Sequence, residues 1–108
     1  MGKQFLTFAT ATILNAVSNG YSFGFDIVDI TGMPGGTVYP ALRRLEDAGY
    51  VSSKWEKERV AKEEARPRRK YYDITRSGRE VLAEAIKRYR LLEPSAMTQV
   101  REPRPSRS

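Results

Sequence analysis

The first part of the chain carries apolar residues at steps of three and four, the spacing of one helix face. This pattern predicts a first helix over residues 4–18, and the pair Asn19-Gly20 after it tolerates the left-handed conformation that ends many helices. A second helix is predicted after Ser22, a suitable N-cap, and residues 32–36 break it with proline and glycine. The apolar positions of these two helices are Phe5, Leu6, Ala9, Ile13, Ala16, Val17, Phe23, Ile27 and Ile30.

The segment GGTVYPALRRLEDAGYV, residues 35–51, predicts a short third helix with two different sides. Thr37 is the expected N-cap, so Pro40 falls in the first turn, where N–H groups have no intrahelical partner and proline loses no hydrogen bond. Ala48 closes this helix and Gly49 ends it, which makes a helix-turn-helix with the second helix. One side is an apolar stripe of Val38, Leu42 and Leu45. The other side carries Thr37, Tyr39, Pro40, Arg43 and Arg44.

After Gly49 the apolar spacing changes to every second residue, which is typical of strands. Two strands of a hairpin are predicted, over residues 51–56 and 69–74, and the connection KERVAKEEARPR is too polar for a core and long for a hairpin loop. Thr75 is the expected cap of a last helix, TRSGREVLAEAIKRYRLL, which Pro94 ends. The residues expected in the core are Ile27, Ile30, Val38, Leu42, Leu45, Val51, Trp55, Tyr72 and Ile74. The alternative for Trp55 is a half-exposed position at the base of the hairpin.

A helix-turn-helix followed by a hairpin is the winged-helix arrangement, so the predicted fold is α+β and mainly α. We expect a winged helix-turn-helix domain over residues 1–75, a C-terminal dimerisation helix over residues 76–93 and a basic tail over residues 94–108. The tail is rich in Pro, Ser and Arg, a composition typical of disorder in the free protein.

The composition narrows the function of this small domain. Among its 108 residues, 19 Lys and Arg against 13 Asp and Glu give a net charge of +6, which favours nucleic acid, an acidic membrane surface or an acidic protein as partner. The absence of cysteine and histidine excludes disulfides, thiolate chemistry and His- or Cys-ligated metal, so no cofactor, no metal and no enzymatic activity are expected. The N-terminal segment is too polar to span a membrane, and we expect a cytoplasmic protein.

The polar side of the third helix is the first candidate for DNA contact. Arg43 can donate two hydrogen bonds to guanine, worth about 1–3 kcal/mol of discrimination, and the hydroxyls of Thr37 and Tyr39 suit phosphate oxygens. The ordinary alternative has Tyr39 packed on the hairpin and Arg43 in solvent, with Arg44 held by Asp47 or by the hairpin stem.

The hairpin, or wing, is the second candidate for DNA contact, through the residues near its tip. Its crowded positive charges repel one another unless an anion relieves them, and the sugar–phosphate backbone beside the bound groove would do so. In the alternative, these residues are a solvated charge run that Glu63 and Glu64 partly neutralise. The charges in question are Arg66, Arg68, Arg69 and Lys70.

The apolar stripe of the last helix predicts a homodimer. A winged-helix unit can bury only the first part of such a helix, and an exposed apolar stripe implies a partner surface. A dimer needs about 1,200–2,000 Å² of buried area in total, and the last helix of each subunit is marginal for that area. We therefore expect the first helix to contribute Phe5, Phe8 and Thr12. The alternative is that the stripe folds back on the first helix of its own chain. The stripe consists of Leu82, Ala85, Ile86, Tyr89 and Leu92.

The segments GTVYPALRRLEDAGYV and KYYDITRSGREVL resemble the PadR-type bacterial transcriptional regulators over about residues 5–92. The resemblance implies a dimeric winged-helix repressor of the short subgroup, in which small phenolic or hydrophobic molecules often act as effectors. Some short members carry a tryptophan on the last helix, which stacks on flat ligands, whereas the single tryptophan here is Trp55 on the hairpin. The matching positions include Tyr39, Pro40, Gly49, Tyr72, Thr75 and Gly78.

Two hypotheses from different classes follow. In the first, the protein is a homodimeric repressor that binds double-stranded DNA at an inverted-repeat operator and is relieved by a small hydrophobic or phenolic ligand. In the second, it is a winged-helix interaction module that binds an acidic protein partner. A gel shift with the region upstream of its own gene separates them, because the interaction module gives no shift at low salt.

Overall fold

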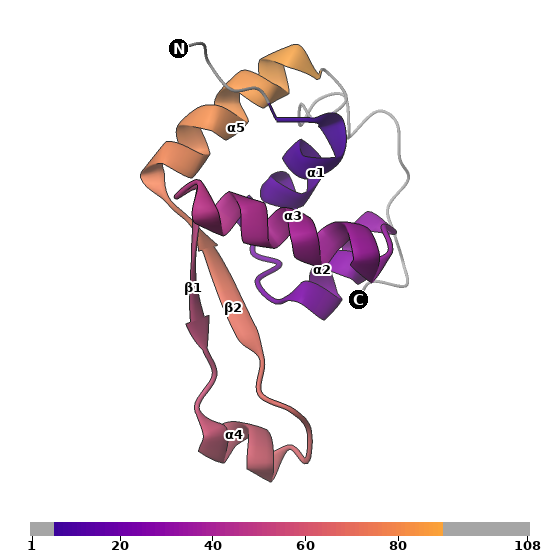
Figure 1. The fold of residues 1–108 in the computed structure, drawn as a ribbon, viewed down its shortest axis with the longest axis vertical. Coiled ribbons are helices and arrows are strands. Elements are labelled where there is room, and N and C mark those ends of the chain that lie inside the picture. Colours follow the sequence, from indigo (N-terminus) through magenta and orange to yellow (C-terminus); the bar gives the residue numbers. More distant parts are fainter. Residues whose placement is uncertain (1–5, 90–108) are drawn as a thin grey trace.

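The computed structural model describes residues 6–89 of the chain. Within this part the chain forms a helical body and a two-stranded antiparallel hairpin, the wing, which extends away from the body and carries a short helix at its far end (Figure 1). This confirms the predicted winged helix-turn-helix fold. The elements are α1 (Phe8–Ser18), α2 (Gly24–Thr31), α3 (Gly35–Asp47), β1 (Val51–Trp55), α4 (Glu58–Glu63), β2 (Lys70–Ile74) and α5 (Arg76–Arg88).

The core lies between α1, α2 and α3, and the base of the hairpin and α5 close it. Fully buried aliphatic side chains from the three helices meet there, as the predicted apolar stripes require. No helix of residues 6–89 is long and apolar enough to cross a membrane. The largest fully buried side chains are Ile13, Leu14, Ile27, Val38, Leu42 and Leu45.

Trp55 is not a core residue, which contradicts the first interpretation of the sequence and agrees with the exposed alternative. Its side chain is 55% exposed, whereas Val51 at the other end of β1 is buried. The alternating pattern of β1 is correct, but the hairpin leaves the helical body along its length, so the inward-facing position at Trp55 has no body to pack against (Figure 1). Two further predicted core residues, Ile30 and Ile74, are half-buried.

The starts of the first two helices differ from the prediction. α1 begins at Phe8 rather than near residue 4, because the Thr7 side chain accepts the backbone N–H of Thr10 and so caps the helix there. The N-cap of α2 is Phe23, not Ser22, and its side chain makes no capping hydrogen bond. The Ser22 carbonyl instead accepts the N–H of Tyr72 at 2.7 Å, which ties this turn to the hairpin.

α3 also begins earlier than predicted, and this changes the position of its proline. Pro34 is the N-cap, and its carbonyl accepts the N–H groups of Thr37 and Val38. Thr37 is therefore inside the helix, and Pro40 lies beyond the first turn rather than within it. Pro40 removes one intrahelical hydrogen bond, that to the carbonyl of the exposed Gly36.

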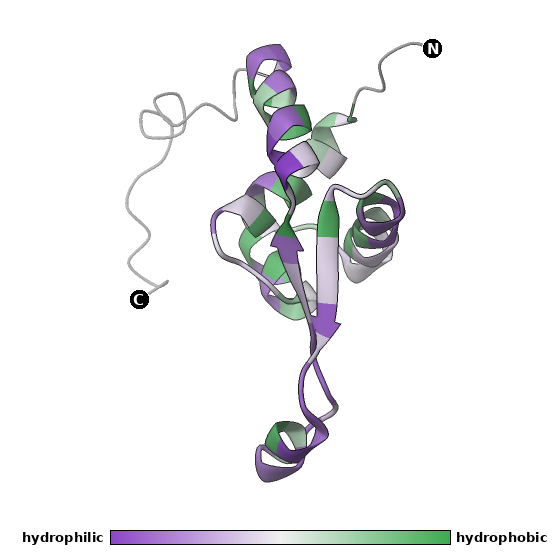
Figure 2. Cartoon of the chain, turned by 90° about the vertical axis from the view of Figure 1, so that its left-hand side faces the viewer, coloured by the Kyte–Doolittle hydropathy of each residue, from purple (hydrophilic) through white to green (hydrophobic). Residues whose placement is uncertain are grey.

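The hairpin pairs Val51 with Ile74 at its base and Trp55 with Lys70 at its outer end. β2 begins at Lys70, one residue later than predicted. The connection contains a helix, α4, that the polarity of its sequence did not predict. Figure 2 shows that the segments between the strands and α4 are hydrophilic, while part of α4 is apolar. Ala61 of this helix is buried.

α5 begins as predicted, with the Thr75 side chain accepting the N–H of Gly78. A Cβ at Gly78 would overlap the carbonyl oxygen of Tyr50, so the Thr-x-x-Gly motif allows the first turn of α5 to lie directly on the entry to β1. The helix ends at Arg88, earlier than the predicted end at residue 92, because Tyr89 already has an extended backbone conformation. Phe5, Leu92 and the tail lie outside the described residues.

Candidate nucleic-acid interface

The polar side of α3 is not covered by the rest of the described chain. Its stripe of apolar residues is buried in the core, and the opposite side faces outward, with the Tyr39 side chain 49% exposed. The structure therefore leaves the predicted reading surface free for a partner. The exposed residues of this side are Thr37, Tyr39, Pro40, Arg43 and Arg44.

Tyr39 is held between α2 and α3. Its ring lies so close to Gly24, the first residue of α2, that a Cβ at Gly24 would overlap the ring. A Cβ at Gly35 would lie 3.3 Å from the same ring. Tyr39 thus packs on two glycines of the helical body, and a Cβ at Gly24 would displace its ring.

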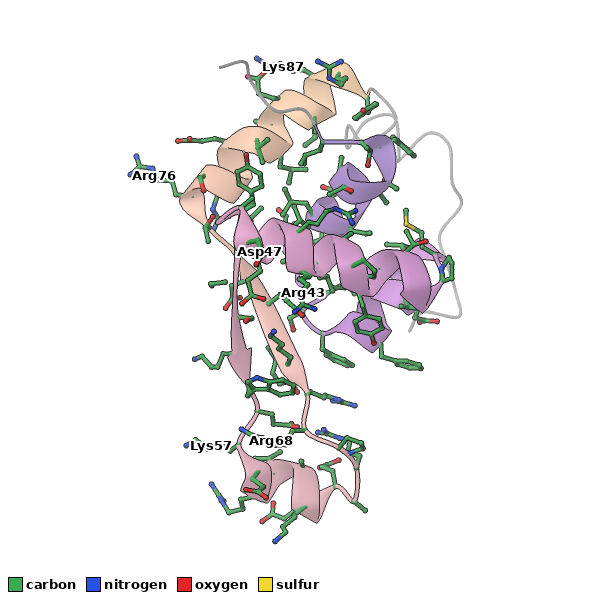
Figure 3. All side chains as sticks on the ribbon, in the orientation of Figure 1. Arg43, Asp47, Lys57, Arg68, Arg76 and Lys87 are labelled. Carbon is green, nitrogen blue, oxygen red and sulfur yellow. The ribbon has the colours of Figure 1, made fainter. Side chains whose placement is uncertain are left out.

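Arg43 and Arg44 extend to different sides of α3. Figure 3 shows Arg43 between α3 and the hairpin. Arg44 instead lines a pocket of about 200 Å³ at the start of α1, together with Leu6 and Thr10. Of the two guanidinium groups, only that of Arg43 is thus directed toward the wing.

A groove of about 550 Å³ separates the wing from the N-terminal ends of α2 and α3. Trp55 of the wing lies on one side, and Phe25 of α2, also exposed, lies on the other. The return arm of the wing, residues 66–70, supplies the positive charge of the groove. Its aromatic lining consists of Phe23, Phe25, Tyr39, Trp55 and Tyr72.

The four cations of this return arm are held in different ways. Arg66 forms an ion pair with Glu56, and Lys70 lies 3.4 Å from a carboxylate oxygen of Glu46. The Arg68 guanidinium lies 5.6 Å from the Trp55 ring centre, and that of Arg69 lies 4.1 Å from the ring centre of Phe23. The guanidinium groups of Arg68 and Arg69 therefore lie against aromatic rings that line the groove, and neither forms an ion pair with a carboxylate among residues 6–89.

Glu56 is the functional residue that sequence reasoning missed. Its carboxylate accepts two hydrogen bonds from the Arg66 guanidinium, at 2.7 and 2.8 Å, and further ones from the Arg69 N–H and the Tyr71 hydroxyl. These donors, Arg66 first, lower the pKa of Glu56 from 4.5 to about 2. The acid that pairs directly with Arg66 of the wing is thus Glu56, and Glu64 adds only a weaker attraction to this cation.

A second carboxylate supports the stem of the wing. The Ser53 hydroxyl donates to Glu46 of α3 and holds the pKa of Glu46 below its usual value, with smaller contributions from Lys70 and Arg43. These contacts join α3 to both strands. Among the described residues no three carboxylates gather in a way that could hold a metal ion.

The predicted dimerisation residues divide into two groups. Leu82 and Ala85 are buried against α1 of their own chain, as the alternative interpretation of the stripe expected. Phe8 remains 42% exposed and meets Tyr89 edge to face, with ring centres 5.3 Å apart. Ile86 and Tyr89 are half-buried, so an apolar surface remains where α1 meets the end of α5.

The helix-turn-helix, the projecting hairpin and the free side of α3 define a winged helix-turn-helix protein. Residues 13–84 match the sequence model of the Transcriptional regulator PadR-like family. The chain belongs to this family of transcriptional regulators. A comparison with curated proteins gives no significant match.

Solved structures share the fold over nearly the whole chain. The protein smu.1704 of Streptococcus mutans is 27% identical, with 94% of this chain and 100% of that chain covered and a TM-score of 0.64. A PadR family regulator of Clostridium difficile is 23% identical, with 86% and 97% covered and a TM-score of 0.66. BpsR of Bordetella bronchiseptica, whose DNA binding is regulated by 6-hydroxynicotinic acid, is 19% identical, with 94% and 72% covered and a TM-score of 0.67.

Proposed function

We propose that this protein is a cytoplasmic, homodimeric repressor that binds duplex DNA with α3 in the major groove and the wing along the adjacent backbone. The observation that carries the proposal is the free polar side of α3 beside a groove whose far wall bears Arg68 and Arg69. Recognition helices of this kind read base edges, and cations beside them bind phosphates.

The residues divide into reading and anchoring roles. Arg43 reads a guanine, and Thr37 and Tyr39 donate to phosphate oxygens. Arg68 and Arg69 neutralise backbone phosphates along the groove. The other three cations have secondary roles in DNA binding. Arg66 and Lys70 already bind carboxylates, and Arg44 faces α1. Pro40 lies on the same exposed side and contributes apolar contact to the DNA.

The proposed dimer uses the surface around Phe8, Ile86 and Tyr89, while Leu82 and Ala85 support it from within. This surface lies at the end of the molecule opposite the tip of the wing (Figure 1). Both surfaces can therefore be occupied at once. Two recognition helices about 34–36 Å apart would then read the two halves of an inverted repeat.

A small hydrophobic or phenolic ligand is proposed to relieve repression. The groove between the wing and α3 has a volume within the range of small-molecule sites and is lined by aromatic rings and cations. BpsR, which shares the fold, offers a precedent for control by a small aromatic acid. A ligand in this groove would compete with DNA directly.

The test is a salt titration of binding to the DNA upstream of the protein's own gene. Arg68→Ala combined with Arg69→Ala should flatten the slope of log K against log salt by about 1.8, since each phosphate contact contributes about 0.9. Arg43→Ala should leave the slope nearly unchanged and relax the preference at one base pair in each half-site. Lys87→Ala, at the far end of α5, is the matched control (Figure 3).

Parent-like binding by both arginine variants would overturn this assignment of the DNA surface. No shift by the parent at low salt would favour the interaction module with an acidic partner instead.

A further inference from the structure

Glu56 is the point at which the two arms of the wing are joined beyond the strands. Its N–H donates to the Arg69 carbonyl at 2.8 Å, and its carboxylate accepts the Arg69 N–H at 3.1 Å. Its own carbonyl accepts Nε of Arg68 at 2.9 Å. This one residue of the outgoing arm thus binds three residues of the return arm, because its carboxylate also accepts two hydrogen bonds from the side chain of Arg66.

These contacts decide where the groove cations lie. The bond from Arg68 Nε to the Glu56 carbonyl fixes the guanidinium beside Trp55, the residue that precedes Glu56. The bonds to the Arg69 backbone fix the turn from which the Arg69 side chain reaches Phe23 of the helical body. Among the described residues, Glu56 is the only one whose carboxylate lies within hydrogen-bonding distance of residues 66–69.

Glu56 is also enclosed, unlike the acids at the tip. Its side chain is 7% exposed, whereas Glu63 at the end of α4 is an exposed residue. An enclosed carboxylate with four donors is far more costly to leave half-paired than an exposed one. Its neighbours are therefore held in one arrangement before any ligand arrives.

We propose that Glu56 is a positioning residue for DNA binding, which holds the return arm of the wing so that Arg68 and Arg69 face the groove beside α3. This inference rests on the proposed function. Glu56 does not touch DNA, and its negative charge by itself opposes DNA binding. Its contribution comes from pre-organisation, which lowers the entropy lost when the two arginines bind phosphates.

The two possible roles of Glu56, as a negative charge and as a positioning residue, predict opposite changes in DNA affinity when its carboxylate is removed. The proposal can therefore be tested. Removal of any acid from the wing raises the net charge by one and should strengthen binding to DNA if only charge matters. Removal of a positioning acid should weaken binding despite the same gain in charge. Glu56→Gln and Glu63→Gln are therefore a matched pair.

The experiment measures the affinity of the full chain for the DNA upstream of its own gene at one fixed salt concentration. We expect Glu56→Gln to weaken binding about tenfold and Glu63→Gln to leave it equal or stronger. Glu56→Asp, which keeps the charge, should recover part of the loss. In a chain that already carries Arg68→Ala and Arg69→Ala, Glu56→Gln should have almost no further effect, because the residues through which it acts are gone.

A spectroscopic measurement separates positioning from a general loss of structure. Trp55 is the only tryptophan, so its fluorescence reports on the groove, while circular dichroism reports on the helical body. Glu56→Gln should change the emission of Trp55 and leave the helix content unchanged. If this variant fails to fold, the comparison of Glu56→Asp with the parent takes its place, and parent-like affinity of Glu56→Asp would then overturn the proposal.

Binding of Glu56→Gln as tight as that of Glu63→Gln would overturn the inference while leaving the proposed function intact. The inference would also be overturned if Glu56→Gln reduced DNA affinity equally in the parent and in the chain that carries Arg68→Ala and Arg69→Ala. Failure of the parent itself to bind DNA would refute the proposed function, and the inference with it.

Discussion

Tyr39 has the position expected of a DNA-contacting residue, but its orientation depends on the backbone of another helix. The ring is exposed on one side and lies on Gly24 of α2 on the other. Because the overlapping atoms belong to the far end of the Tyr39 side chain, the ring can swing away if Gly24 gains a Cβ. The glycine therefore controls the direction of the tyrosine more than the stability of the fold.

Gly24→Ala should weaken binding to the upstream DNA by about 1 kcal/mol, the coupling typical of residues in contact. The same substitution should have little effect in a chain that carries Tyr39→Ala. Gly36→Ala, where a Cβ meets nothing within 4 Å, is the control for stability and should stabilise α3 by about 0.5–1 kcal/mol. Affinity measurements and urea unfolding of the variants test this, and equal effects of Gly24→Ala in both backgrounds would contradict it.

At the scale of elements, the wing beyond its base is held mainly by polar contacts, whereas its base belongs to the apolar core. The segments between the strands and α4 are hydrophilic in Figure 2, Glu56 joins the two arms of the wing, and Glu46 connects the strands to α3. An element held in this way is sensitive to the protonation of those groups. Its stability should therefore depend on pH more than that of the helical body.

The pKa of Glu56 is lowered from 4.5 to about 2, chiefly by hydrogen bonds from Arg66. The stabilisation it gives is fully present above pH 4.5 and is lost as the pH falls through about 2, because the folded state binds the proton less readily than the unfolded chain. We expect the melting temperature of the parent to fall more steeply between pH 5 and about pH 2 than that of Glu56→Gln.

Thermal unfolding followed by Trp55 fluorescence measures this difference. Glu63→Gln should follow the profile of the parent, since that side chain is exposed. Identical profiles for all three proteins would mean that Glu56 does not stabilise the wing.

At the scale of the whole molecule, the two proposed surfaces lie at opposite ends. The wing and α3 form one, and the junction of α1 with the end of α5 forms the other (Figure 1). Because Leu82 and Ala85 are buried within the chain, a partner can contact only the outer members of the predicted stripe. Phe8 is the most exposed apolar side chain of this surface.

Phe8→Glu should convert the proposed dimer to a monomer, because it would bury a charge without a partner in the proposed interface, at a cost of about 2 kcal/mol or more. The substitution should leave the fold of the single chain intact, because the Phe8 side chain is already exposed there. Lys87→Glu, on the side of α5 away from the stripe, should leave the mass unchanged. Sedimentation equilibrium of the three proteins is the measurement, and a parent that sediments as a monomer would rule out the proposed dimer.

The sequence by itself determined the fold, because the local rules and the long-range contacts agree there. The apolar stripe of α3, the left-handed Gly49 and the Thr75 cap each follow from nearest neighbours along the chain, and all occur as predicted. The same agreement made the free side of α3 predictable, since burying Val38 and Leu42 necessarily turns Tyr39 and Arg43 outward.

Only the tertiary structure decided how the charges of the wing are used. Pairing of Glu56 with Arg66 depends on the hairpin register, because the two residues are ten positions apart in the sequence. Between them lies α4, a helix that the polar sequence of this segment did not predict. The exposure of Trp55 likewise depends on where the hairpin leaves the body. Such contacts have no local signal, because a carboxylate in a polar run has the same sequence pattern whether it faces solvent or an arginine on the opposite strand.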